Sequence, residues 1–386
     1  MISSHVRMEF APERTAKVNN LLQQIEKKVF AGQRLTKEEG LALMECKDLL
    51  FLGRLAREIK LRHSGRKIFF NVNFHINLTN ICVSECRFCA FGVRKESGKA
   101  YFMTLEDILQ KIAKSLPESA TELHIVSGLH PDQPFDYYLE VIDTLHRRYP
   151  GIHLKAFTAV EINYFAEISG LSIREVLLKL KHAGLGSMPG GGAEVFSPRI
   201  RGMLCPGKAT GERWLEIMET AHDLGIRTNA TMLFGHLETN EERIDHLISL
   251  RDLQDKTGGF QSFVPLAFHP ENTSLSEIKP VSAYEKLKMI AVSRLMLDNF
   301  DHIKAYWVML GVSLAQIALE FGADDLDGTV VKEKITHAAG AKTKEGISMD
   351  ELLELIFSAG YLPVERDTLY HELKIFRKRD CQCCPE

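Results

Sequence analysis

The sequence has no excess of either charge sign, no long apolar run and no low-complexity linker. Its 386 residues carry 48 Lys and Arg against 51 Asp and Glu, a net charge of −3, which leaves no basic surface for nucleic acid. No run reaches the ~18 apolar residues of a membrane-spanning helix, and residues 1–20 lack the apolar core of a secretory signal. With 45% hydrophobic and 26% charged residues, disordered and fibrous classes are excluded. We expect a soluble, cytoplasmic protein that binds neither nucleic acid nor membranes.

The eight cysteines fall into two groups and two single positions. In a cytoplasmic chain such cysteines indicate metal or redox chemistry rather than structural disulfides. Cys46 lies in an amphipathic helical pattern and is expected to pack as a small apolar residue. The terminal group is expected to be a disordered or adventitious metal-binding end, with an auxiliary cluster as the alternative, and it consists of Cys381, Cys383 and Cys384. The other group has the spacing CxxxCxxC, and it consists of Cys82, Cys86 and Cys89.

Short β-branched or aromatic runs alternate with helical patterns through the middle of the chain. Most of the runs are apolar throughout, as strands buried on both faces of a parallel sheet are. We expect strands at 68–77, 122–128, 153–160, 184–189, 227–235, 260–268, 302–310 and 326–331. The run at 184–189 is the weakest, because Gly and Pro disfavour strands. Capping boxes are expected at Thr36 with Glu39, Ser172 with Glu175, Thr239 with Glu242, Ser282 with Glu285 and Ser348 with Glu351.

Eight strand–helix units between residues 67 and 331 match the size of a (β/α)8 TIM-type barrel. The sequence therefore predicts an α/β fold with this barrel as its central domain, and a doubly wound open sheet is the alternative. Residues 1–66 are expected to form an N-terminal helical extension, and residues 332–386 a C-terminal helical extension and tail.

The CxxxCxxC motif directly follows the first expected strand, at the end of the barrel where active sites form. Three thiolates this close together indicate one metal centre. A structural zinc ion needs a fourth ligand, which His75, Cys205 or the tail could supply. A four-iron cluster held by three cysteines instead leaves one iron open for chemistry. A zinc protein, or an electron-transfer cluster completed by Cys205, is the non-enzymatic alternative.

This motif, with Phe88 just before its third cysteine, resembles that of the radical S-adenosylmethionine (SAM) superfamily. The resemblance implies that Cys82, Cys86 and Cys89 hold a [4Fe-4S] cluster and that SAM chelates the open iron. It also implies reductive cleavage of SAM to methionine and a 5′-deoxyadenosyl radical, with a reducing partner such as flavodoxin or ferredoxin. The protein then binds, orients and shields this cofactor pair, and no further catalytic side chain is expected.

Longer stretches resemble one branch of that superfamily, the menaquinone enzymes of the futalosine route and their relatives in deazaflavin synthesis. They are NFHINLTNICVSECRFCAF, HIVSGLHPDQPFDYY, KAFTAVEI, SMPGGGAEVF, ATMLFGH, FHPENT and PVERDTLY. HPENT at 269–273, HIKAYWVMLG at 302–311 and HAAGAKTKEG at 337–346 are most similar to the aminodeoxyfutalosine synthase family. One departure is CAFGVRKES, where a tyrosine is expected soon after Phe91.

Membership in the synthase family would imply a transferase that uses SAM as a consumed co-substrate. The adenosyl radical adds to the enolpyruvyl double bond of 3-[(1-carboxyvinyl)oxy]benzoate, an aryl enolpyruvyl ether. The aryl group migrates, carboxylate is lost, and 6-amino-6-deoxyfutalosine forms. The alternatives within the branch are the cyclic dehypoxanthine futalosine synthase and a deazaflavin (FO) synthase subunit.

Cofactor-binding residues are expected where the strands end. Ser127 and Gly128 form a small turn of the kind that holds the SAM amino group in the superfamily, and Phe88 is expected against the adenine. Glu161 could accept hydrogen bonds from the ribose or the ammonium group, or stand exposed at a helix start. Arg201 is the candidate to pair with a carboxylate, with Arg199 as the competing choice.

Substrate-binding residues are expected on the same rim. Three glycines at 190–192, with Gly191 at their centre, permit close backbone approach, and Glu194 follows them; the lysine of a phosphate loop is absent. His75 and Asn77 share one face of the first strand, although a satisfied core histidine is an equal interpretation. At least one of three strand-end histidines is expected to contact substrate, and they are His130, His236 and His269.

Overall fold

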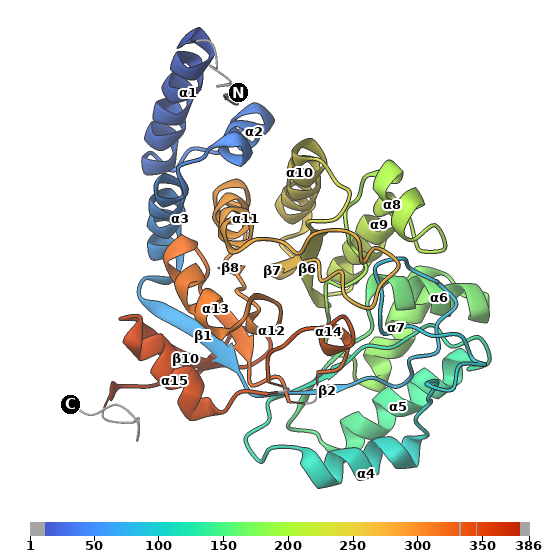
Figure 1. Cartoon of the computed structure of the whole chain (residues 1–386). Coiled ribbons are helices and arrows are strands. Elements are labelled where there is room, and N and C mark those ends of the chain that lie inside the picture. Colours follow the sequence, from blue (N-terminus) through green and yellow to red (C-terminus); the bar gives the residue numbers. More distant parts are fainter. Residues whose placement is uncertain (1–11, 332, 345, 379–386) are drawn as a thin grey trace, which may run out of the picture.

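The computed structural model describes residues 12–331, 333–344 and 346–378, and it shows helices around a core of parallel strands (Figure 1). The longer helices are α1 (Pro12–Phe30), α2 (Lys37–Glu45), α3 (Leu49–Ser64), α4 (Leu105–Ser115), α5 (Phe135–Arg148), α6 (Ala159–Ser169), α7 (Ile173–Ala183), α9 (Gly211–Asp223), α10 (Asn240–Thr257), α11 (Ala283–Met296) and α15 (Met349–Ser358). The shorter ones are α8 (Pro198–Leu204), α12 (Trp307–Leu310), α13 (Val312–Ala318), the 3-10 turn η1 (Leu319–Phe321) and α14 (Ile335–Ala338). No helix in the described ranges is long and apolar enough to cross a membrane.

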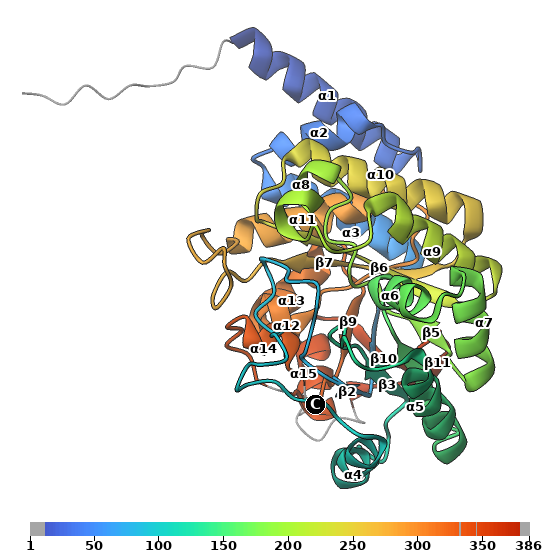
Figure 2. The same ribbon diagram turned by 90° about the vertical axis from the view of Figure 1, so that its right-hand side faces the viewer.

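Seven strands form one parallel sheet in the order in which they occur along the chain. They are β2 (Asn73–Ile76), β3 (Glu122–Ile125), β4 (His153–Ala156), β5 (Ser187–Met188), β6 (Arg227–Phe234), β7 (Phe260–Ala267) and β8 (His302–Ile303). Helices connect them on the outside, so the sheet curls as a TIM-type barrel does (Figure 2).

The segment around β9 (Asp325–Gly328) closes this curled sheet. On one side Ala305 N–H donates to the Asp325 carbonyl at 2.8 Å, beside β8. On the other side His75 N–H donates to the Val331 carbonyl at 3.0 Å, beside β2. The eighth strand position of the expected barrel is thus filled, and the predicted α/β barrel class is confirmed.

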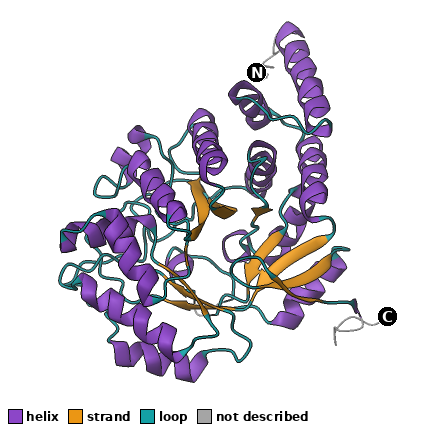
Figure 3. Ribbon diagram, turned by 180° about the vertical axis from the view of Figure 1, so that it is seen from behind, coloured by secondary structure: helices purple, strands orange, loops and turns teal. Residues whose placement is uncertain are grey.

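A smaller sheet covers the other end of the barrel. Its order is β11–β10–β1–β9, with β1 at Lys67–Asn71, β10 at Leu362–Arg366 and β11 at Glu372–Ile375. The expected strand at 68–77 is therefore two strands, one in each sheet, and Figure 3 shows the two groups of strands, the smaller one on the side of the C-terminus. Only helices were expected after residue 331, so β10 and β11 correct that prediction. Strand β10 is stabilised by its pairing with β1, almost 300 residues away, and β11 by its pairing with β10.

The helix-start signals were mostly correct. Reciprocal capping boxes begin α2, α7, α10 and α15 as predicted. At α11 Ser282 caps the helix, but the Glu285 carboxylate pairs with Arg243 instead of returning to the cap. The expected strand at 302–310 is also shorter, because the chain leaves the sheet after β8 and Trp307 Nε1 donates to the Gly328 carbonyl at 2.8 Å.

Candidate functional site

A cavity of about 370 Å³ opens at the end of the barrel where the parallel strands finish. Loops that follow β2, β3, β4 and β5 contribute its mouth, and side chains inside the strands contribute its deeper wall. This is the end at which TIM-type barrels place their active sites.

The three cysteines of the CxxxCxxC motif all line this cavity and are half-buried. Their loop is held by its own backbone, because Cys82 N–H donates to the Val93 carbonyl at 3.0 Å and Gly92 N–H donates to the Cys89 sulfur at 3.2 Å. Burial raises the pKa of the Cys86 thiol to about 12. A thiolate at this position therefore needs a positive partner, which a bound iron supplies.

The arrangement fits an iron–sulfur cluster. Within residues 12–331, 333–344 and 346–378, no three His, Cys, Asp or Glu side chains converge as the ligands of one ion do. A [4Fe-4S] cluster joins each cysteine to a different iron, and all three thiols line the one cavity where such a cluster can lie. Cys205 is buried at the end of α8 and does not line the cavity. Cys381, Cys383 and Cys384 lie outside the described residues.

Ser127 and Gly128 lie where the loop after β3 touches the cysteine loop. A Cβ at Gly128 would lie 2.4 Å from the Ile81 carbonyl oxygen, so only glycine fits. Gly128 N–H also donates to the Thr79 carbonyl at 2.9 Å, which ties the two loops together. Ser127 Oγ is buried at the cavity and has no hydrogen-bond partner among the described residues. Such a hydroxyl is available to a ligand atom.

Glu161 is buried at the cavity wall and is not the exposed helix-start residue of the simpler interpretation. One carboxylate oxygen accepts from Ser127 N–H at 3.0 Å, and the other accepts from Thr158 N–H at 2.7 Å and from its hydroxyl at 2.8 Å. Burial outweighs these donors and raises the pKa of Glu161 to about 7. Glu161 thus joins the loops after β3 and β4 and holds Ser127 in place.

The glycines at 190–192 form part of the cavity wall, with Gly191 held by a 3.2 Å hydrogen bond from Trp214 Nε1 to its carbonyl. Arg201 lies behind this loop. Its guanidinium donates to the Gly192, Ala193 and Ala209 carbonyls, so it does not reach the cavity. The expected direct contact of Arg201 with a ligand carboxylate is therefore corrected to a role in holding the loop. The competing Arg199 is exposed and paired with Glu242.

Lys208 is a cavity residue that the sequence did not indicate. Its ammonium group lies 2.7 Å from a Glu194 carboxylate oxygen and 4.9 Å from the centre of the Phe88 ring. Burial alone would raise the pKa of Glu194, but Lys208 keeps it below its ordinary value. Lys208 therefore connects two expected residues beside the cysteines, because it pairs with the Glu194 carboxylate and lies over the Phe88 ring.

The deeper wall consists of polar side chains from the strands. His75, His124 and Lys155 occupy aligned positions on β2, β3 and β4, and all three line the cavity. Lys304, which follows β8, pairs with Asp327 on β9 at the same wall. Of these five only His75 was expected from the sequence. The two lysines had a local signal, since each interrupts an otherwise apolar strand run.

The remaining expected residues divide between the cavity and the surrounding structure. Of the three strand-end histidines, His269 lines the cavity. His130 accepts a hydrogen bond from the main-chain N–H two residues later, and His236 bonds the carbonyl three residues earlier. Asn77 donates to a main-chain carbonyl after β3 at 3.1 Å. These last three side chains do not line the cavity and instead stabilise the strand ends.

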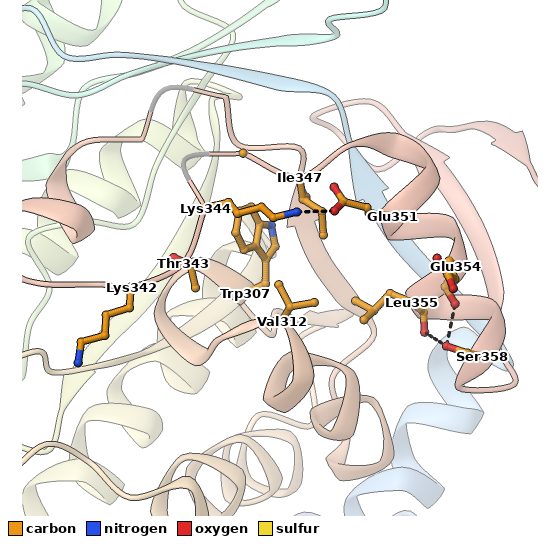
Figure 4. Close-up of a pocket in the computed structure, with 11 residues that line it drawn as sticks. Trp307, Val312, Lys342, Thr343, Lys344, Ile347, Glu351, Glu354, Leu355 and Ser358 are labelled. Atoms are coloured by element: carbon orange, nitrogen blue, oxygen red, sulfur yellow. Dashed lines mark hydrogen bonds and ion pairs between the residues drawn. The ribbon is translucent and has the colours of Figure 1, made fainter. Parts of the chain in front are cut away.

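A second hollow of about 530 Å³ lies between α13, α15 and residues 342–347 (Figure 4). Lys344 and Glu351 pair with each other there at 2.7 Å, and Lys342 points away. Ser358 donates to the Glu354 carbonyl at 2.8 Å. Because Lys344, Glu351 and Ser358 already have partners within the protein and the three cysteines of the motif lie elsewhere, the cavity at the cysteines is the stronger candidate site.

Comparison with known families gives two adjoining matches. A model described as "Radical SAM superfamily" matches residues 76–250, and one described as "CofH/MqnC C-terminal region" matches residues 257–379. The aminodeoxyfutalosine synthase of Thermus thermophilus is 46% identical over 91% of this chain and 96% of its own length. The cyclic dehypoxanthine futalosine synthase of Streptomyces coelicolor is 38% identical, covering 92% and 89%.

A third relative is the 5-amino-6-(D-ribitylamino)uracil–L-tyrosine 4-hydroxyphenyl transferase of Methanopyrus kandleri, 42% identical over 84% of this chain and 89% of its own. Among solved structures, a maturase of the [FeFe]-hydrogenase superimposes with a TM-score of 0.71 at 19% identity, covering 91% of this chain and 78% of its own. Methylornithine synthase has a TM-score of 0.70 at 18% identity, covering 88% and 97%. At these identities the structural likeness shows the fold alone.

Proposed function

The chain belongs to the radical SAM superfamily and to its CofH/MqnC branch, and from this premise we propose that it is an aminodeoxyfutalosine synthase of menaquinone biosynthesis. In the proposed reaction the adenosyl carbon of SAM joins the enolpyruvyl carbon of 3-[(1-carboxyvinyl)oxy]benzoate. The aryl group migrates from oxygen to carbon and carbon dioxide leaves. The products are 6-amino-6-deoxyfutalosine and methionine, so the enzyme is a transferase.

Radical SAM enzymes use a [4Fe-4S] cluster with SAM, and when bound this pair supplies the 5′-deoxyadenosyl radical by reductive cleavage of SAM. In the proposal Cys82, Cys86 and Cys89 hold the cluster. Ser127 offers its free hydroxyl to SAM, and Phe88 offers a ring face beside the Lys208 cation. These residues orient SAM and exclude water, which is the protein's share of such chemistry.

One observation supports the aryl substrate in particular, which is that the cavity lining combines apolar and polar side chains. Val126, Val264 and Leu266 line the cavity together with the thiols, and so does the polar group of His75 and its neighbours. An aromatic ring fits an apolar section, and carboxylates require polar groups at its ends. The identities of 46% and 44% to two aminodeoxyfutalosine synthases favour the same substrate over those of the 38–42% relatives.

The test is anaerobic product analysis by mass spectrometry. The cluster-reconstituted protein is given dithionite, SAM and 3-[(1-carboxyvinyl)oxy]benzoate, and a Cys86→Ala variant serves as the control without a complete cluster. An adduct of the adenosyl moiety with the aryl carboxylate, less carbon dioxide, is the expected product. If wild-type protein releases only 5′-deoxyadenosine, the substrate is wrong, and dehypoxanthine futalosine and the deazaflavin precursors are tried next. Replacing dithionite by flavodoxin or ferredoxin tests the proposed reducing partner.

A further inference from the structure

We propose that the polar group at the deeper wall of the cavity binds the ring carboxylate of the substrate and selects aryl ethers that carry one. The residues of this group that would receive the carboxylate are His75, His124, Lys155 and Lys304. The inference rests on the proposed function and deepens it, because it assigns a place to one of the two substrate carboxylates.

The group is built by the register of three neighbouring strands. His75 pairs with His124, and His124 pairs with Lys155, across β2, β3 and β4. Their side chains therefore stand side by side at one height inside the barrel. The two imidazole rings stack with centroids 4.5 Å apart and planes 11° apart. This height is below the cysteine loop but still at the cavity.

A contact with a buried carboxylate places one imidazole at the cavity. Glu122 is fully buried, and one of its oxygens lies 3.5 Å from His124 Nδ1 while the other lies 2.7 Å from Lys155 Nζ. Burial would raise the pKa of Glu122, but Lys155 and His124 hold it well below its ordinary value. The Glu122 carboxylate thus faces Nδ1 of His124. The other ring nitrogen of His124, Nε2, is left for the cavity, and the His124 side chain is 19% exposed.

The second imidazole has an unused polar atom. His75 Nε2 is buried and has no hydrogen-bond partner among the described residues. Leaving a buried donor or acceptor unpaired is unfavourable. Burial, with the neighbouring His124, lowers the pKa of His75 to about 3, so the ring is neutral and can donate one N–H. A ligand oxygen at the cavity floor would complete its hydrogen bonding.

Charge and depth indicate which carboxylate binds here. Lys155 and Lys304 are balanced by Glu122 and Asp327, so this wall carries no net charge of its own and offers two lysines to an anion. His124 and Ser127 are three residues apart on one strand and loop, which corresponds to roughly 10 Å. The intervening apolar wall can hold one aromatic ring. If the enolpyruvyl carbon lies near Ser127 and the cysteines, where SAM is proposed to bind, the ring carboxylate points to His75.

The experiment compares two substrates with the cluster-reconstituted protein and SAM. One is 3-[(1-carboxyvinyl)oxy]benzoate, and the other is 2-phenoxyacrylate, which lacks only the ring carboxylate. The variant is His75→Phe, which keeps an aromatic ring for stacking and removes both nitrogens. The matched control is His153→Phe, because His153 lies two residues before Lys155 on β4, is bonded to Ser187 at 2.8 Å and does not line the cavity.

We expect wild-type protein to prefer the carboxylated substrate in kcat/KM, mainly through a lower KM. His75→Phe should reduce this preference about 10- to 100-fold, the range of a hydrogen bond to a charged group, and His153→Phe should keep it. An equal loss on both substrates in His75→Phe, or no preference in wild-type protein, would overturn the assignment.

A binding measurement separates this inference from the proposed function. Calorimetry on the same holo protein with SAM compares 3-hydroxybenzoate with phenol. If neither ether yields product but 3-hydroxybenzoate binds and His75→Phe weakens its binding, the carboxylate site stands and the proposed reaction falls. If 3-hydroxybenzoate binds no better than phenol, the carboxylate site is wrong whatever the reaction.

Discussion

Replacing Gly128 by alanine tests how closely the loop after β3 must approach the cysteine loop. The added Cβ would lie 2.4 Å from the Ile81 carbonyl oxygen and 2.9 Å from its carbon. Both atoms belong to the backbone directly before Cys82, so no side chain can rotate away. The loops must separate by about 0.6 Å, the difference between 2.4 Å and the 3.0 Å minimum of real Cβ contacts.

The fold should survive this change while the site should not. Overpacking of this kind costs about 1–3 kcal/mol, which is less than a typical stability of roughly 5–15 kcal/mol. A misplacement approaching 1 Å at a reacting centre can cost about 100-fold in rate. We therefore expect Gly128→Ala to keep its far-ultraviolet circular dichroism, to retain less iron and sulfide after reconstitution, and to cleave SAM about 100-fold more slowly.

The matched control is Gly98→Ala, in the connection between the cysteine motif and α4, where a Cβ would meet nothing within 4 Å. Iron and sulfide content, the electron paramagnetic resonance of the reduced cluster, and the rate of 5′-deoxyadenosine release are measured on both variants. Equal cluster content and equal rates in the two would refute the argument from close approach, and so would global unfolding of Gly128→Ala.

The structure also predicts the effects of three further substitutions on stability or activity. Burial raises the pKa of Glu161 to about 7 from 4.5, so between these pH values the folded chain holds a proton that the unfolded chain releases. The free energy of unfolding therefore falls by roughly 3 kcal/mol as the pH rises from 4.5 to 7. Glu161→Gln should flatten this dependence of the free energy of unfolding on pH, as measured in urea titrations. Lys208→Met leaves Glu194 buried and unpaired, so urea unfolding should show a loss of about 3–5 kcal/mol, partly recovered when Glu194→Gln is added. Arg201→Met removes the donors behind the glycine loop and should abolish activity and lower the thermal midpoint, whereas Arg199→Met breaks an exposed pair worth ~1 kcal/mol or less.

The barrel was predictable because its signals are local. Each strand that is buried on both faces reads as an apolar run, and a capping box marks the start of a helix within four residues. The smaller sheet had no such signal. Strand β10 includes Pro363 and ends in charged residues, and it is a strand only because β1 lies beside it. The division of 68–77 likewise depends on which partner each half finds.

Some residues of the candidate site could likewise be predicted from nearby sequence, whereas the positions of others depend on residues distant in the sequence. The cysteine spacing and the Ser127–Gly128 turn lie within short stretches of sequence, and the structure brings both to one cavity. Arg201 could not be placed from the sequence, since its direction is set by carbonyl groups that only the folded loop presents. Lys208 was missed because its partner Glu194 lies 14 residues away across a short helix.

The polar interior of this barrel is itself an argument about function. TIM-type barrels ordinarily fill the space inside the strands with branched apolar side chains. Here that space holds ion pairs of Lys155 with Glu122, and of Lys304 with Asp327. Buried pairs of this kind are often no more stabilising than apolar residues of the same volume. Stability comes instead from the apolar layer outside the strands, where side chains such as that of Trp214 are completely buried against helices. With the core placed there, the barrel interior is free to serve as a binding surface, and Lys155, Lys304 and Asp327 line the cavity inside it.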